Sequence, residues 1–295
     1  LKTINIKGKE YVEVNERLRY FRITYPNFSL ITEVLQCTEE HCVMKATILN
    51  EHGVAVRDIW STSRKELINM TPKNQTGLNY SDLARIVLER SKSSREAVNI
   101  AASLIKKYGE CTYGGNSHMF ADSKEAWIMI QFAGGRGLWA AERLGPNSIR
   151  ASRPGYIEEI PIHEKNNPNF LYSKNLISFC KKKGWHSRGP FNVNKILGDR
   201  KGRWKGVKWI EREIKKLAKK PNRIKLKDVI WAIRTSKLTG DTAGYGQIVP
   251  LVNPGYNNLR MLWHSPIGAV SSPFSPIFMG QTIIPEEFMM HRYLT

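Results

Sequence analysis

Residues 117–132 read "SHMFADSKEAWIMIQF", and this stretch decides what kind of fold the chain can adopt. Two runs rich in apolar residues, 117–121 and 126–132, flank the polar tetrapeptide Asp122-Ser123-Lys124-Glu125. Aspartate and serine favour tight turns because their side chains hydrogen-bond to the backbone close by. The stretch therefore predicts a β-hairpin, and with it an antiparallel sheet in the middle of the chain.

Helices and further strands are predicted on both sides of this hairpin. Residues 81–91 form a predicted helix with Ser81 as N-cap, and residues 94–108 form a second one that ends at Gly109. Strands follow at 138–144 and 148–152, helices at about 171–183, 206–219 and 226–236, and short strands at 247–280. This order of helices, strands, helices and strands predicts an α+β fold in which two sheets stack between helical layers.

The N-terminal residues predict a small β-rich unit. Residues 3–8, 9–14, 28–36 and 42–49 alternate or cluster apolar residues as strands do, and a short helix is expected after Asn15. Asn50-Glu51-His52-Gly53 is a turn signal followed by the strand 54–56, whereas residues 59–78 are polar and are expected to form a connector. We therefore predict two units, residues 1–58 and residues 59–295.

Composition limits the class of protein. The chain has 295 residues, 41% of them hydrophobic, and a net charge of +20. No apolar run approaches the ~18 residues that span a membrane, and the first ten residues lack the apolar core of a secretory signal. The four cysteines have no zinc or redox spacing, so free thiols in a reducing compartment are expected. The sequence predicts a cytoplasmic protein, although the first residue, Leu1, leaves open a further N-terminal segment.

A basic segment, residues 181–230, interleaves lysines and arginines with Trp185, Trp204 and Trp209. Such a surface suits nucleic acid, because cations displace counterions and aromatic rings stack on unpaired bases. The alternative is a solvated helical face whose tryptophans seal the core. The histidines have no metal-ligand spacing, and no phosphate-binding loop is recognisable. No metal and no cofactor are therefore expected.

Six stretches resemble, in family order, the dipeptidase family of N-terminal-nucleophile cysteine hydrolases. They include "TGLNYSDLARIVLERSKSSREAV" at 76–98, "ADSKEAWIM" at 121–129 and "GLWAAERLGP" at 137–146, and the resemblance covers about residues 60–295. It implies an αββα sandwich, here incomplete at both ends, and hydrolysis of dipeptides or short peptides. The implied mechanism uses the thiol of an N-terminal cysteine as nucleophile and amide groups as oxyanion donors.

The resemblance also suggests site residues. The family's opening Cys-Thr-Thr and its Arg-Asn-Glu-Asp segment are both missing, so an impaired enzyme is expected; only Cys37-Thr38 matches the opening pair. Cys37 is therefore the candidate nucleophile. The Asn-Glu-x-Gly pattern makes Asn50 the candidate oxyanion donor, unless Asn50 and Gly53 merely build a hairpin. In "SRPGYI", Ser152 and Arg153 are candidates for binding the substrate. Arg153 would pair with the carboxylate of the substrate.

A second resemblance concerns residues 4–56. The stretches "INIKGKEYVEVNERLRYFRITYPNFSLITEVLQ" and "CVMKATILNEHGVAV" look like the N-terminal half of phage-type single-strand annealing proteins. Two alternatives to a dipeptidase-like hydrolase therefore stay open. One is a single-stranded DNA binding or annealing protein that uses this unit and the basic segment, and the other is a non-catalytic hybrid.

Overall fold

The computed structural model describes residues 3–6, 9–12, 29–37, 42–151, 157–164, 166–218, 224–237, 245–252, 255–266 and 268–280, with side chains from residue 49 onward. The helices are α2 (Lys65–Asn69), α3 (Tyr80–Arg90), α4 (Ser94–Tyr108), α5 (Leu176–Lys182), α6 (Val193–Leu197), α7 (Lys205–Leu217) and α8 (Leu226–Arg234), and a 3-10 turn spans Asn257–Leu259.

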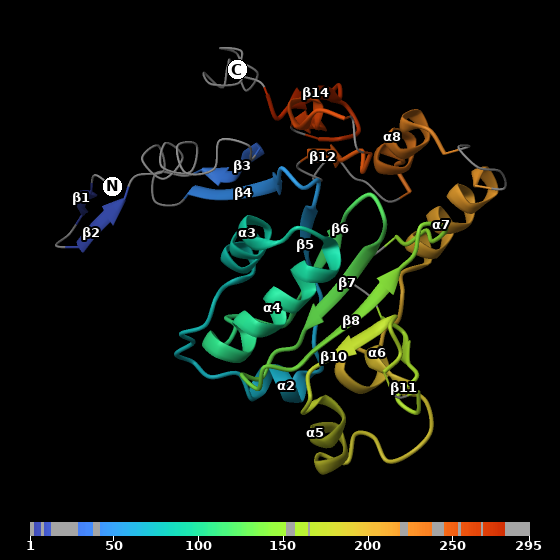
Figure 1. The fold of residues 1–295 in the computed structure, drawn as a ribbon. Helices are drawn as coiled ribbons and strands as arrows, with labels where there is room; N and C mark the ends of the chain where they lie inside the picture. The colour runs from blue at the N-terminus through green and yellow to red at the C-terminus, as the bar shows by residue number, and fades with distance from the viewer. Residues whose placement is uncertain are drawn as a thin grey trace.

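Most of the strands join one large antiparallel sheet with the order β10-β8-β7-β6-β5-β4-β3 (Figure 1). The strands are β3 (Ser29–Cys37), β4 (Cys42–Leu49), β5 (Ala55–Trp60), β6 (Asn116–Ala121), β7 (Ala126–Gln131), β8 (Trp139–Leu144) and β10 (Phe170–Tyr172). Smaller sheets pair β1 (Thr3–Ile6) with β2 (Lys9–Val12), β9 (Glu159–Ile160) with β11 (Phe191–Asn192), and β12 (Tyr245–Ile248) with β13 (Met261–Pro266) and β14 (Ser275–Phe278).

One face of the large sheet is covered by α3 and α4. Phe120, Trp127 and Met129 project from β6 and β7 into this layer and are fully buried. They meet an apolar stripe of both helices, formed by Leu83, Val87, Leu88, Ala97, Val98, Ala101, Leu104 and Ile105. Burial of a side chain such as Leu104 contributes about 1.5–3 kcal/mol, so this layer is a main source of stability.

The opposite face of the sheet carries a second core. Ile128 and Ile130 alternate with Trp127 and Met129 along β7 and therefore point to this side. They pack with Leu67 of α2 and with buried residues of β8, β9, β11, α5 and α6. Residues Ala126–Gln131 are thus buried on both faces of the sheet, except for the partly exposed Ala126.

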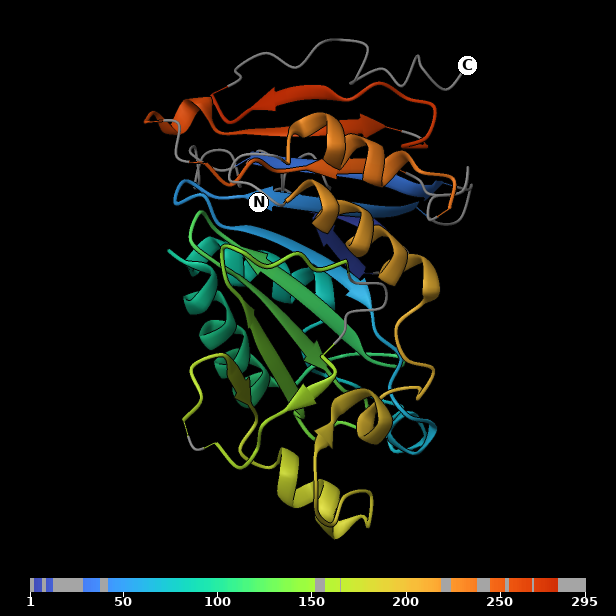
Figure 2. The ribbon, with the colours of Figure 1, turned by 90° about the vertical axis from the view of Figure 1, so that its right-hand side faces the viewer.

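The C-terminal sheet β12–β14 lies against the β3–β5 end of the large sheet, with α7 and α8 running alongside (Figures 1 and 2). Met279 contacts Leu49 and Ala55 in a small apolar cluster. The Arg57 guanidinium stacks over the Tyr245 ring at 4.6 Å from its centroid. Within the described residues, no helix is long and apolar enough to cross a membrane.

The α+β class predicted from the sequence is confirmed, and so is the hairpin at 122–125, since β6 and β7 pair from Asn116↔Gln131 to Ala121↔Ala126. The predicted boundary between residues 58 and 59 lies inside β5, whose sheet takes strands from both predicted units. The division into two units, and the paired-sheet αββα sandwich, stay predictions.

Four local predictions were wrong. Helix α3 is capped by Asn79, whose side chain accepts a hydrogen bond from the Asp82 N–H, and not by Ser81. Residues 148–151 form no strand. Residues 170–172 form β10 instead of a helix, because they hydrogen-bond the free edge of β8. The connector at 59–78 contains α2, which forms because Leu67 is buried beneath the sheet.

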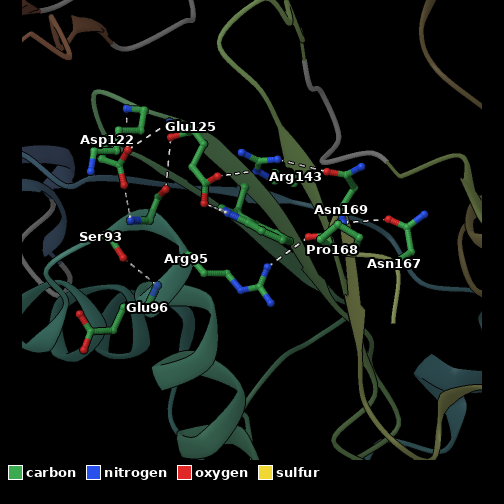
Figure 3. A network of polar contacts seen from close by, with 12 residues as sticks. Ser93, Arg95, Glu96, Asp122, Glu125, Arg143, Asn167, Pro168 and Asn169 are labelled. Carbon is green, nitrogen blue, oxygen red and sulfur yellow. Dashed lines mark hydrogen bonds and ion pairs between the residues drawn. The ribbon is translucent and has the colours of Figure 1, made fainter. Parts of the chain in front are cut away.

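A polar network holds the N-terminus of α4 against the β6–β7 turn (Figure 3). The Ser94 N–H donates to Asp122 Oδ2 at 2.7 Å, while Lys124 N–H and Glu125 N–H donate to Asp122 Oδ1 at 2.8 and 3.1 Å. Burial by itself raises the pKa of Asp122, but these backbone donors outweigh it and leave the pKa below its usual 3.8. The carboxylate therefore stabilises both the turn and the helix start.

Removing this carboxylate is expected to destabilise the protein. Asp122→Ala leaves three N–H groups without their acceptor, and we expect a loss of about 1–3 kcal/mol at pH 7, measured by urea unfolding. Because the folded-state pKa is lowered, this contribution is present above pH 3.8 and is lost as the pH falls through the folded pKa. The exposed Glu159→Ala variant is the control. A loss that does not shrink in acid would contradict the assignment.

Candidate functional site

Asn50, the candidate oxyanion donor, is fully buried in the turn between β4 and β5. Its Oδ1 accepts hydrogen bonds from the N–H groups of His52 and Val54, each at 3.0 Å. Its Nδ2 donates to Leu88 O at 2.9 Å and to Ser91 O at 2.8 Å, both near the C-terminal end of α3. Both amide protons of Asn50 are therefore engaged by backbone carbonyls.

Gly53 completes the same turn. Its N–H donates to Asn50 O at 2.9 Å, and its φ of 77° is a left-handed conformation that glycine adopts without strain. A Cβ at this position would also collide with the Arg260 guanidinium. Asn50 and Gly53 thus build the turn, as the hairpin interpretation expects. The oxyanion role of Asn50 stays a prediction, and it requires Asn50 to give up one of its bonds to α3.

The other predicted site residues are not brought together with Asn50 in the described part of the chain. Cys37 is the last residue of β3, and its side chain lies outside the described side chains. Ser152 and Arg153 also lie outside the described residues. Their roles as nucleophile and as substrate-binding residues stay predictions.

The residues that lead into Ser152 are firmly anchored. Arg150 donates two hydrogen bonds to the Glu142 carboxylate, at 2.6 and 3.0 Å. The buried Glu211 of α7 accepts a hydrogen bond from the Ala151 N–H at 2.8 Å and forms an ion pair with Arg203. Fixed charge pairs of this kind hold a segment in one place, so the chain enters position 152 from a rigid support.

The two cysteines with described side chains differ in environment. Cys180 of α5 is buried, and this burial raises the pKa of its thiol to about 11. A thiol with such a pKa supplies little thiolate at neutral pH and is a poor nucleophile. Cys111, in contrast, is partly exposed. For Cys180 the structural role expected from the sequence agrees with its surroundings.

The buried His118 of β6 is held inside the sheet layer. Its Nε2 lies 2.9 Å from Tyr80 O and its Nδ1 3.2 Å from the Gln131 side chain, and its ring stacks on Phe120. Burial lowers the pKa of His118, so the imidazole is neutral at pH 7. Among the described residues, no group of three or more His, Cys, Asp and Glu side chains could hold a metal ion.

The tryptophans of the basic segment fall into two groups. Trp185 lies beneath the Arg64 guanidinium, 3.8 Å from the ring centroid, and packs against Phe179, as expected of a ring that seals the core. Trp204 is 48% exposed at the start of α7. Trp209 packs against Trp231, which is 44% exposed, with ring centroids 5.8 Å apart. The described part of α7 and α8 thus presents aromatic rings beside exposed lysines.

A cleft of about 720 Å³ opens at the other end of the sheet from Asn50. Asn50 lies at the end of the large sheet where Ala55 of β5 pairs with Ala121 of β6. The cleft lies at the opposite end, where Gln131 of β7 pairs with Trp139 of β8. The five steps along the strand from Ala126 to Gln131 place these ends about 17 Å apart, at ~3.4 Å per residue. The connector before α3, the C-terminal half of α4, the β7–β8 loop and the residues after β10 line the cleft.

Glu110 is the most perturbed acid in the cleft. Its Oε1 is buried and has no hydrogen-bond partner among the described residues, and burial raises the pKa of this carboxyl well above the usual 4.5. Glu110 is held at this position by the backbone. Leu78 N–H donates to Gly109 O and Cys111 N–H to Leu78 O, at 3.3 and 2.8 Å. The backbone of Glu110 also forms an isolated parallel bridge with Leu78, and Gly77 packs closely against it.

Comparisons with known proteins agree with the dipeptidase resemblance. The model of peptidase family C69 matches residues 2–205. This range includes residues 4–56, and the resemblance of those residues to annealing proteins stays a prediction. The probable dipeptidase B of Lactococcus lactis subsp. lactis is 36% identical over 116 residues, which are 39% of this chain and 23% of that protein.

Two other curated proteins match in the same way. The probable dipeptidase of Salmonella dublin is 28% identical over 123 residues, 41% of this chain and 27% of its own length. The probable dipeptidase of Latilactobacillus sakei is 26% identical over 155 residues, 51% of this chain and 31% of its own length. The matched part of the chain thus spans less than a third of each of these relatives.

The hydrogen bonds of Asn50 lead to a testable expectation. Asn50→Ala removes four hydrogen bonds in a buried place and should cost about 2–4 kcal/mol of unfolding free energy, measured by urea denaturation. Asn50→Asp keeps the acceptor oxygens for His52 and Val54 but loses both donors to α3, so it should also be destabilised. The exposed Asn147→Ala variant should change stability by less than about 0.5 kcal/mol. An Asn50→Ala protein as stable as the wild type would rule out the structural role.

Proposed function

Since the chain belongs to peptidase family C69, we propose that it is part of a dipeptidase-like cysteine hydrolase that cleaves peptide bonds of dipeptides or short peptides. The observation that carries the proposal is the family match over residues 2–205, supported by the three dipeptidase relatives. The αββα sandwich that the family resemblance implies is part of this proposal for the whole protein.

In this proposal an N-terminal cysteine thiolate attacks the substrate carbonyl, and its own α-amino group takes up the proton. An amide group stabilises the developing oxyanion, a contribution of about 3 kcal/mol per donor. Asn50 supplies this donor once it exchanges a bond with α3, Ser152 donates one hydrogen bond to the substrate, and Arg153 pairs with the substrate carboxylate. Impaired activity of residues 1–295 is part of the proposal, because the family's Cys-Thr-Thr opening and its Arg-Asn-Glu-Asp segment do not occur in this sequence.

The test is hydrolysis of a dipeptide panel by the protein expressed from its whole reading frame, beside the segment 1–295. We expect turnover by the former that iodoacetamide abolishes, and at least about 100-fold less turnover by the latter, because the family's Cys-Thr-Thr motif does not occur in it. Cys37→Ser in both proteins decides whether Cys37 is the nucleophile. Turnover that survives alkylation, or hydrolysis by neither protein, would contradict the proposal.

A second candidate function is binding of single-stranded nucleic acid through α7 and α8. The exposure of Trp204 and Trp231 beside a basic helix favours it, because exposed rings are available for stacking on bases. The net charge of +20 supports attraction of a polyanion.

This candidate is tested by the fluorescence anisotropy of a labelled oligothymidylate. We expect the affinity to fall at least about tenfold as salt rises from about 50 to about 200 mM, because bound phosphates release counterions. Trp204→Ala and Trp231→Ala should each weaken binding about tenfold through lost stacking, whereas the exposed Tyr113→Ala should not. Affinity that is independent of salt would eliminate this function.

A further inference from the structure

The cleft beside Glu110 has an acidic pole that lacks a partner. An ionised carboxylate buried without a partner is costly, which is why the pKa of Glu110 rises instead. No cation offsets this effect, since burial is its sole cause. A ligand that carries an ammonium group would supply the missing partner: it would pair with the carboxylate and favour its charged form.

The rim of the cleft has the opposite charge. Lys106 of α4, Arg136 of the β7–β8 loop and Lys174 after β10 are exposed and line the cleft. Among the residues that the structure describes, none of these three cations forms an ion pair. Cations from three separate elements around one opening form a site for a carboxylate.

The wall between the two poles is apolar and aromatic. Ile105 and Phe132 are buried, and Trp139 and Tyr172 are partly exposed on the same cleft. Apolar walls with a few polar groups of fixed position are typical of sites for small molecules, and the volume of about 720 Å³ lies within their usual range. The cleft therefore accommodates a ligand with two opposite charges and an apolar side chain.

We propose that this cleft is a binding site for free amino acids with apolar or aromatic side chains. The ammonium group pairs with Glu110, the carboxylate with one or more of the rim cations Lys106, Arg136 and Lys174, and the side chain lies on the wall formed by Phe132 and Trp139. The site lies at the other end of the sheet from Asn50, and the proposal does not depend on peptide hydrolysis.

The proposal is tested by isothermal titration calorimetry with L-phenylalanine, which the protein cannot hydrolyse. Two analogues each lack one charge: N-acetyl-L-phenylalanine has no ammonium group, and L-phenylalanine amide has no carboxylate. We expect each analogue to bind at least about tenfold more weakly than L-phenylalanine, a cost of about 1.4 kcal/mol. Glu110→Gln should weaken L-phenylalanine by the same factor, and Arg136→Gln should weaken it while leaving the amide unaffected. The exposed Lys182→Gln is the matched control. Thermal unfolding verifies that each variant is folded.

Protons provide a second readout. The other titratable groups that line the cleft are Lys106, Tyr108, Arg136, Tyr172 and Lys174. Because the ammonium group favours the ionised form of Glu110, binding of L-phenylalanine should release a proton. The released proton makes the measured heat of binding depend on the ionisation enthalpy of the buffer. For the same reason, the affinity for L-phenylalanine should rise from pH 5 to pH 7. Glu110→Gln should remove both effects, which assigns them to Glu110 and not to the other groups.

Three results would overturn the proposal. They are no binding of L-phenylalanine at about 10 mM, equal binding of the N-acetyl compound, and unchanged binding to Glu110→Gln. None of these results bears on the peptidase proposal, because no readout involves hydrolysis.

Discussion

The whole arrangement depends on the burial of β7 on both faces. Trp127 and Met129 require one apolar layer, and Ile128 and Ile130 on the other face require a second. A strand covered on one side only would leave about half of these side chains in water, at about 1.5–3 kcal/mol each. The helices α3 and α4 and the group formed by α2, α5 and α6 are the two covers that this strand needs.

The strands of this sheet also separate two chemically different ends. At one end, Asn50 joins the β4–β5 turn to α3 through buried hydrogen bonds that leave no free donor. At the other end, Glu110 keeps a buried oxygen that has no partner among the described residues, beside an open cleft. A polar group that has all its hydrogen bonds serves the fold, whereas a buried group that lacks them retains the capacity to bind a ligand.

Local sequence signals predicted the elements whose start and end are marked by residues within or next to them. Helix 94–108 was predicted at its observed bounds because its apolar residues follow the helical period and Gly109 ends it. The hairpin at 122–125 was predicted for a similar reason, since Asp122 bonds to the backbone of its own turn. Strand β10 and helix α2 were missed, because an edge of β8 and a buried surface beneath β7 stabilise them, and both lie far away in the sequence.

The amino-acid sequence by itself determined the α+β class, the central hairpin, the end of α4 at Gly109 and the resemblance to the peptidase family, because each rests on residues close together in the chain. Only the tertiary structure decided what Asn50 and Glu110 do. The carbonyls that bind the Asn50 amide are 38 and 41 residues away, and the backbone of Glu110 pairs with Leu78 on the other side of α3 and α4 in the sequence. Partners at such separations are chosen by packing, and packing is a property of the folded chain.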